Sequence, residues 1–232
     1  MPYTQDQVRL VLSRDRIVRA AIELIERENL EALSMRRIAA ELDVAVMSLY
    51  NHVPNKAALL DGIAERILGG MDVADEPGMS WTERARALVR AYRKVAHDYP
   101  RCVTLVMTRK IEAPSGMRAA EHALAIADDA GFDGGTAVRI MRALLAYAIG
   151  AQVREVGAAK MLDYLPQDRR EEHLGKLDPM EFPHVVALRH ELMSHDPETD
   201  FEFGLDLLIG SLDRLPRSQS AGARSARAVL GP

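Results

Sequence analysis

The sequence predicts an all-α protein with a small N-terminal helical domain and a larger C-terminal helical domain. Apolar residues recur at helical spacing along most of the chain, and alternating runs of β-branched and aromatic residues are missing. The composition changes over the stretch 69–78, which is rich in glycine and acidic residues and which we interpret as a linker. A chain of 232 residues, 48% of them hydrophobic, is long enough to bury a core in one or two domains.

The composition also excludes several classes of protein. The single cysteine, Cys102, excludes a disulfide framework and a zinc site with several thiolates from one chain. Because the formal net charge is −4, any contact with nucleic acid must come from a local basic patch. Residues 1–16 are polar, so we expect no signal peptide, and the apolar run 143–153 is about half of the roughly 20 residues that span a bilayer. We therefore expect a cytoplasmic protein without membrane contact.

The N-terminal domain should contain four helical segments, three of which begin at a capping residue. Ser13, Ser34 and Asn55 each carry a side-chain oxygen that can accept a hydrogen bond from a free N–H group of the first turn. Asp43 lies where the chain must turn, and Pro54 interrupts the helical pattern. We expect helices from 13 to about 28, from 34 to 42, from about 46 to 51 and from 56 to about 68.

The larger domain should begin at a capping box, Ser80-Trp81-Thr82-Glu83, in which the serine and the glutamate satisfy each other's backbone N–H groups. The helix that starts there should run to about Tyr99 and stop at Pro100. We expect further helices over 101–107, 116–130, 136–156, 183–193 and 199–215, and a mobile loop over 162–180. The resulting division is an arm 1–12, the N-terminal domain 13–70, a linker 71–79, the larger domain 80–215 and a disordered tail 216–232.

Residues 34–56 form the most informative stretch of the sequence. Two short helices joined by a tight turn, the second with an outward polar face, are the pattern of a helix-turn-helix, here within a three-helix domain. The second helix can enter the major groove of DNA, which is about 12 Å wide. We expect its inward face to hold Val44, Leu49 and Val53, and its outward face to hold Val46, Met47, Ser48, Asn51 and His52. Tyr50 should lie at the edge, where its hydroxyl group can reach a phosphate.

Three cations flank this helix in the sequence. Arg36 and Arg37 lie at the start of the preceding helix, where cations and exposed N–H groups can hold phosphates. Lys56 begins the following helix and can grip the DNA backbone from the other side. Residues 1–70 hold nine lysine and arginine residues against ten acidic residues. Binding must therefore depend on where the cations are placed rather than on net charge.

The stretch 13–68 resembles the N-terminal domain of the TetR family of bacterial transcriptional regulators. The matching residues are Ser34, Arg36, Ile38, Ala39, Leu42, Val44, Leu49, Tyr50, His52, Val53, Asn55, Lys56 and Leu59. Asp43 replaces the usual turn glycine, which aspartate can do because it tolerates left-handed φ. Val46 and Met47 are apolar where tetracycline repressors place a polar side chain that reads bases; they can still contact a thymine methyl group. The segment 201–215 resembles, more weakly, the last helix of tetracycline-repressor-like C-terminal domains.

This resemblance implies a homodimer that binds a palindromic operator in double-stranded DNA and an unknown small-molecule ligand. The helices 136–156 and 199–215 carry more apolar residues than one monomer core requires, so we expect the dimer interface there, with the alternative that they only fill the core. The expected interface residues are Leu145, Ile149, Val153, Leu205, Leu208 and Leu212. Flexible methionines and a few polar groups suit a ligand pocket, for which we expect Tyr92, His97, Thr104, Met107, Met141 and Gln152.

Enzymatic readings of the sequence are weaker. His190 and His195 flank a stretch like a zinc-protease motif, but a spacing of five residues places them about 140° apart on a helix. The sequence carries no nucleophile elbow, phosphate-binding loop or dinucleotide fingerprint. We therefore expect a regulator, usually a repressor released by its ligand, and neither an enzyme nor a protein with a cofactor or metal. A regulatory metal site from distant residues stays open, as does a ligand-binding protein whose helix-turn-helix no longer reads a specific sequence.

Overall fold

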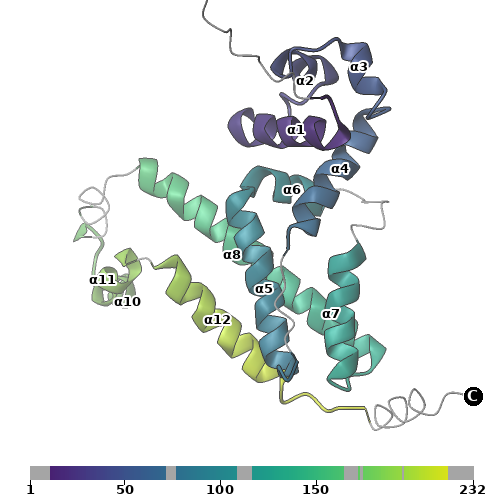
Figure 1. Cartoon of the computed structure of the whole chain (residues 1–232). Coiled ribbons are helices and arrows are strands. Elements are labelled where there is room, and N and C mark those ends of the chain that lie inside the picture. The colour runs from purple at the N-terminus through teal and green to yellow at the C-terminus, as the bar shows by residue number, and fades with distance from the viewer. Residues whose placement is uncertain are drawn as a thin grey trace, which may run out of the picture. The chain divides into compact units, whose positions relative to one another are not determined.

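Helices are the regular elements of the chain, and the residues that the structure describes contain no strand, which confirms the all-α prediction (Figure 1). The computed structural model describes residues 11–71, 77–108, 117–164, 172, 175–194 and 196–218, except the side chains of 104, 107, 108 and 156–164. The chain divides into two compact units. Unit 1 comprises residues 1–72 and 94–122, and unit 2 comprises residues 73–93 and 123–232. Among the described residues, none of the helices has the length and hydropathy needed to cross a membrane.

Unit 1 is built on five helices, which lie close to their predicted bounds. They are α1 (Arg14–Glu28), α2 (Met35–Glu41), α3 (Val46–Tyr50), α4 (Lys56–Gly69) and α6 (Pro100–Thr108). The three predicted caps are present: Ser13 Oγ accepts from the N–H of Arg16, Ser34 Oγ from that of Arg37 and Asn55 Oδ1 from that of Ala58, at 2.8–3.2 Å. Each cap satisfies an N–H group that the first helical turn leaves without a partner, which is why the helices begin where the sequence predicts.

The core of unit 1 is apolar and lies where α1 packs against α2, α4 and α6. Its largest fully buried side chains are Ile17, Leu24, Ile25, Leu33, Ile38, Leu49, Leu59, Ile63 and Ile67. Helices α1 and α4 approach so closely that a Cβ atom at Gly62 would lie 2.8 Å from Val18 Cγ2. Helix α6 belongs to this unit by its packing, although its residues fall within the stretch 80–215 that the sequence suggested as one domain. The domain boundaries themselves stay a prediction.

Unit 2 contains most of α5 (Trp81–Asp98) and α7 (Arg118–Asp129), together with α8 (Gly134–Tyr164), α10 (Pro183–Ala187), α11 (Arg189–Met193) and α12 (Pro197–Leu212). Its predicted capping box is present, because the N–H of Ser80 donates to Glu83 Oε2 at 2.7 Å and the N–H of Glu83 donates to Ser80 Oγ at 3.3 Å. The hydroxyl group of Ser80, which donates to Glu83 Oε2 at 2.6 Å, and the Ser80 N–H lower the pKa of Glu83. Three predicted helices have other bounds: α8 continues eight residues past 156, the helix expected over 183–193 is divided at Leu188, and the helix expected over 199–215 runs from Pro197 to Leu212.

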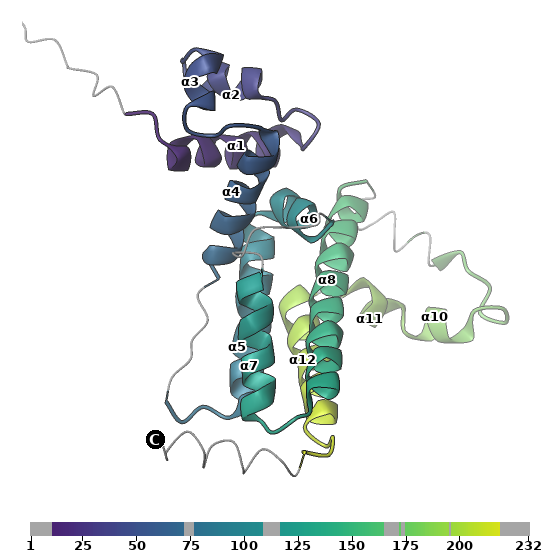
Figure 2. The same cartoon turned by 90° about the vertical axis from the view of Figure 1, so that its right-hand side faces the viewer.

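Ion pairs that the sequence did not predict hold α12 in unit 2. Three arginines of α5 pair with three acids of α12 that lie one turn apart: Arg86 with Asp206 at 3.0 Å, Arg90 with Glu202 at 2.5 Å, and Arg93 with Glu198. The arginine numbers rise as the acid numbers fall, so α5 and α12 run antiparallel (Figure 1). Helices α8 and α12 lie side by side in both views (Figures 1 and 2) and contact each other.

The residues after α12 close one end of unit 2. Trp81 Nε1 donates to Asp213 Oδ1 at 2.7 Å, and the guanidinium group of Arg217 lies 3.8 Å from the centre of the Phe132 ring. The N–H of Ser218 donates to the carbonyl oxygen of Gly131 at 2.8 Å. Arg217 and Ser218 fall in the stretch 216–232 that we expected to be disordered, yet they are packed. Residues 219–232 lie outside the described part of the chain.

Candidate nucleic-acid interface

The turn between α2 and α3 has the geometry of a helix-turn-helix. Asp43 has a φ of 52°, the left-handed conformation that favours glycine and that aspartate tolerates. The N–H of Asp43 donates to the carbonyl of Ala40 at 3.2 Å, and that of Val44 donates to the carbonyl of Ala39 at 3.0 Å. The substitution of the turn glycine by Asp43 is therefore compatible with the turn, as predicted.

Helix α3 presents one face to the interior of unit 1 and one face to solvent. Leu49 and Val53 are buried as predicted, whereas Val44 is only half-buried. On the outward face, Met47 is 73% exposed, Tyr50, Asn51 and His52 are exposed, and Val46 and Ser48 are half-buried. A large exposed apolar side chain on a five-residue helix has no partner in its own unit. Met47 is thus available to contact another molecule.

The three predicted phosphate-binding cations lie in different surroundings. Arg36 is exposed and makes no ion pair with a described residue. Arg37 Nη2 donates to both carboxylate oxygens of Glu28, at 2.6 and 2.7 Å. Lys56 Nζ donates to the carbonyl oxygen of Leu33 at 2.9 Å, so it ties the start of α4 to the loop before α2 and keeps two N–H donors for other partners.

The sequence did not indicate which acidic side chains pair with the arginines of α1 and α2. Arg27 Nη2 lies 2.5 Å from Glu41 Oε1 and 3.2 Å from Glu28 Oε1, and the hydrogen bonds that Arg27 donates, first to Glu41 and then to Glu28, raise its pKa. The composition of residues 1–70 shows one more acidic than basic residue but not which arginine each acidic residue contacts. Glu28 and Arg37 are nine residues apart on different helices, so no local pattern joins them.

The structure brings together only part of the expected ligand pocket. Tyr92 Oη donates to Gln152 Oε1 at 3.3 Å, and burial raises the pKa of Tyr92 to about 12. Met141 lies elsewhere in unit 2, at a cavity described below. His97 is exposed and belongs to unit 1. The side chains of Thr104 and Met107 lie outside the described part of the structure.

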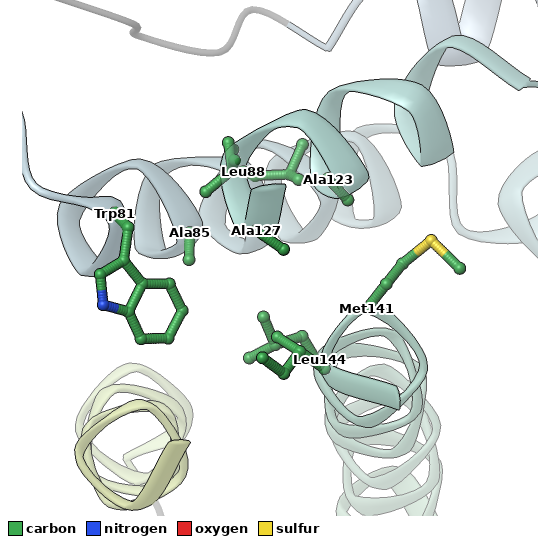
Figure 3. Close-up of a pocket in the computed structure, with 9 residues that line it drawn as sticks. Trp81, Ala85, Leu88, Ala123, Ala127, Met141 and Leu144 are labelled. Carbon is green, nitrogen blue, oxygen red and sulfur yellow. The ribbon is translucent and has the colours of Figure 1, made fainter. Parts of the chain in front are cut away.

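A small cavity in unit 2 lies between α5, α7 and α8 (Figure 3). Its lining is apolar and comprises Trp81, Ala85, Leu88, Ala123, Ile126, Ala127, Ile140, Met141 and Leu144. Its volume is about 20 Å³, enough for about one water molecule, so a drug-sized ligand requires more space than these residues leave.

The sequence also did not suggest the half-buried ion pair between Arg93 on α5 and Glu155 on α8, whose atoms lie 3.3 Å apart.

The expected dimer residues divide into exposed and buried positions. Val153 on α8 is 67% exposed and Leu145 is also exposed, whereas Ile149 on α8 and Leu208 and Leu212 on α12 are half-buried. Leu205 is fully buried within unit 2, so its side chain is covered by its own chain, and the interface itself stays a prediction. The heptad-like spacing on α12 marks the side that packs on its own unit, where Phe201 and Ile209 are buried as well. Phe203 and Leu207 are exposed apolar residues of α12 that do not follow this spacing and were not among the expected interface residues.

Metal chemistry finds no support in the described part of the chain. No group of three or more histidine, cysteine or acidic residues is placed there to hold a metal ion. Cys102 is buried, and this burial raises the pKa of its thiol. A thiol with a raised pKa is a poor nucleophile.

Comparisons with known proteins cover both parts of the chain. The family model for bacterial regulatory proteins of the tetR family matches residues 17–63, and the model for the tetracyclin repressor-like C-terminal domain matches residues 74–214. The chain is 32% identical to an HTH-type transcriptional regulator of Saccharopolyspora erythraea over 65% of this chain, and spans 64% of that relative's length. It is 30% identical to the class G tetracycline repressor protein of Vibrio anguillarum over 88% of this chain and 95% of that protein.

Solved structures agree with the sequence relatives. The crystal structure of ActR from Streptomyces coelicolor in complex with actinorhodin is 28% identical and superimposes with a TM-score of 0.72. The match covers 87% of this chain and 97% of that one. The family models together cover most of the chain, and the helix-turn-helix lies inside the first of them. The chain therefore belongs to the TetR family of bacterial regulatory proteins.

Proposed function

We propose that the protein is a dimeric, sequence-specific DNA-binding regulator that binds its operator through α2 and α3 and releases it when a small molecule binds. It acts in the cytoplasm and not as an enzyme. The observation that carries this proposal is the outward face of α3, on which Met47 is exposed, together with the exposed cations at the starts of α2 and α4. The relatives named above are regulators or repressors of transcription, which supports the same function.

DNA readout would divide between positioning contacts and base contacts. Arg36 and Lys56 are suited to phosphates, since both carry N–H donors without carboxylate partners among the described residues. Met47 has no hydrogen-bonding donor and is suited to the methyl group of thymine in the major groove. Ser48 can donate or accept at a base edge. Loss of a phosphate contact lowers affinity for all sequences, whereas loss of a base contact changes which sequence is preferred.

Dimerisation follows from the exposed apolar face of unit 2. Leu145 and Val153 on α8 and Phe203 and Leu207 on α12 expose large apolar side chains on two neighbouring helices. A second copy of the chain can remove this face from water. The dimer would place two copies of α3 about 34–36 Å apart, the separation of successive major grooves, and would therefore bind a palindromic operator.

Release by a ligand requires two conformations that differ in DNA affinity. A small molecule that binds better to the conformation with misplaced α3 helices shifts the population towards it, and a coupling of 1–3 kcal/mol lowers operator affinity about 5- to 150-fold. Helix α4 is suited to transmit this change because it packs on both α1 and α6. The likeness to ActR, whose structure contains actinorhodin, supports a small-molecule ligand of some kind.

The test is the selection of bound duplexes from a random library at a defined salt concentration. We expect a near-palindrome with half-sites about one helical turn apart. The variant Met47→Ala should select a changed motif, whereas Arg36→Ala should weaken binding to every duplex. Arg139→Ala is the matched control, because Arg139 is an exposed arginine of α8 in unit 2, and it should bind as the wild type does. Salt-sensitive binding without an enriched motif would favour a ligand-binding protein with a degenerate helix-turn-helix.

A further inference from the structure

Four charged side chains meet where the end of α1 lies beside α2. Arg27, Glu28, Arg37 and Glu41 form one network, with Glu28 in contact with both arginines. The shortest contact of Glu28 is to Arg37, whose Nη2 donates to both carboxylate oxygens at 2.6 and 2.7 Å. The network contains two cations and two anions. The charge of Arg37 at the start of α2 is therefore neutralised within the protein, whereas the neighbouring Arg36 makes no ion pair with a described residue.

The pair is accessible to an outside anion. The side chain of Arg37 is 51% exposed and that of Glu28 is 33% exposed, so water and a phosphate group can reach both. Both bonds to Glu28 use Nη2, which leaves the Nε and Nη1 donors of Arg37 without a partner among the described residues. A guanidinium group binds carboxylate and phosphate in the same fork-like geometry. Glu28 thus occupies one of the nitrogens through which Arg37 would bind a DNA phosphate, and its negative charge lies beside the others.

We propose that Glu28 competes with DNA phosphate for Arg37 and so holds the DNA affinity of the helix-turn-helix below the value that its cations alone would give. The inference rests on the proposed DNA-binding function. Exposed ion pairs contribute little to stability, so a phosphate can displace Glu28. The displaced carboxylate nevertheless stays close to the phosphate and repels it. Both effects oppose binding, and both disappear when Glu28 is neutral.

The fold does not depend on this pair. Helix α2 begins at the cap of Ser34, and its inner residues Ile38 and Ala39 are buried in the core of unit 1. Neutralising Glu28 should therefore leave α2 in place. If the only role of Glu28 were structural, its substitution would loosen the helix-turn-helix and would therefore weaken DNA binding. An increase in affinity is the result that competition alone predicts.

The experiment measures binding to a mixed-sequence duplex over a series of salt concentrations. Glu28→Gln should bind about three- to fivefold more tightly than the wild type at low salt, the upper range of an exposed ion pair. Its salt dependence should steepen by up to about one unit, because one more uncompensated cation meets a phosphate. Glu23→Gln is the matched control, because it removes the same charge from the same helix. Glu23 is exposed and makes no ion pair with a described residue.

Arg37 should carry the whole effect. In an Arg37→Ala background, Glu28→Gln should bind no more tightly than Glu23→Gln does in that background. Glu28→Ala serves as a second variant, and thermal melting establishes that each variant is folded. Binding by Glu28→Gln that equals the Glu23→Gln control, or falls below the wild type, overturns the competition and makes Glu28 a group that positions Arg37. A wild-type protein that binds no duplex at any salt concentration contradicts the proposed function instead.

Discussion

The carboxylate of Glu26 on α1 accepts a hydrogen bond from the backbone N–H of Cys102, in the first turn of α6, at 2.8 Å. The same carboxylate accepts from the N–H of Arg101 at 3.3 Å, and Arg101 Nη1 donates back to the carbonyl oxygen of Glu26 at 2.6 Å. The end of α1 and the start of α6 are thus joined by reciprocal hydrogen bonds. A carboxylate at this position satisfies free N–H groups and suits the positive end of the helix dipole.

Removing this cap should weaken unit 1. We expect Glu26→Ala to lower the free energy of unfolding by about 0.5–2 kcal/mol, the usual cost of losing a helix cap. Glu26→Gln keeps a side-chain oxygen that can accept one of the hydrogen bonds, so it should lose less. Urea unfolding followed by circular dichroism measures both variants. Equal midpoints for Glu26→Ala and the wild type would show that water replaces the carboxylate at no cost.

Gly204 is required by the close approach of α12 to Tyr147 on α8. A Cβ atom at position 204 would lie 2.5 Å from Tyr147 Oη, whose hydroxyl group donates to the carbonyl oxygen of Phe201. We expect Gly204→Ala to destabilise the protein by about 1–3 kcal/mol, because it forces Tyr147 to move. A Cβ atom at position 150 of α8 would meet no atom within 4 Å, so Gly150→Ala should be neutral or stabilising by up to about 1 kcal/mol. Thermal melting distinguishes the two, and equal effects would disprove the packing argument.

The exposed apolar face of α8 and α12 predicts a mutation that separates the dimer. Leu207 is 59% exposed on α12, so Leu207→Asp should leave the fold of unit 2 intact while burying a charge in the interface. Light scattering should then report a monomer mass, with unchanged helical content. Val11→Asp introduces the same charge at an exposed apolar residue of unit 1 and should remain dimeric. A Leu207→Asp dimer would place the interface on another surface.

The ion pair of Arg90 and Glu202 predicts a dependence of stability on pH. A hydrogen bond from Arg90 lowers the pKa of Glu202, so the folded state binds this proton less readily than the unfolded state. The resulting stabilisation is complete above the ordinary glutamate pKa of about 4.3 and is lost as the pH falls through the lowered pKa. Glu202→Gln should therefore be less stable than the wild type at pH 7, by at most about 1 kcal/mol, and the difference should vanish in acid.

Urea midpoints measured from neutral to acidic pH test this prediction. Glu181→Gln provides the control, since Glu181 is exposed and has no ion pair with a described residue. Its stability should follow that of the wild type at every pH. A Glu202→Gln variant that stays parallel to the wild type into the acidic range would mean that the pair with Arg90 contributes nothing in solution.

Signals within a few residues of one another determined the helices and the helix-turn-helix. Ser13, Ser34 and Asn55 each accept a hydrogen bond from the N–H group three residues ahead, and Ser80 and Glu83 form their box over the same distance. The left-handed turn follows in the same way from the side chain of Asp43. Such features are readable from sequence because the chain between their members is short. The resemblance to the TetR family also rests on residues that lie close together in the sequence, from Ser34 to Leu59, and it implies a function for them.

Only the tertiary structure decided which partners these residues meet. The spacing of Leu205 and Leu207 marks two sides of α12 but cannot show which side packs on α8, and the buried side is that of Leu205. Glu28 and Arg37 are nine residues apart, and Glu26 and Cys102 are 76 residues apart. Their contacts arise from how separate helices pack, and packing depends on many weak apolar contacts made together rather than on any local pattern.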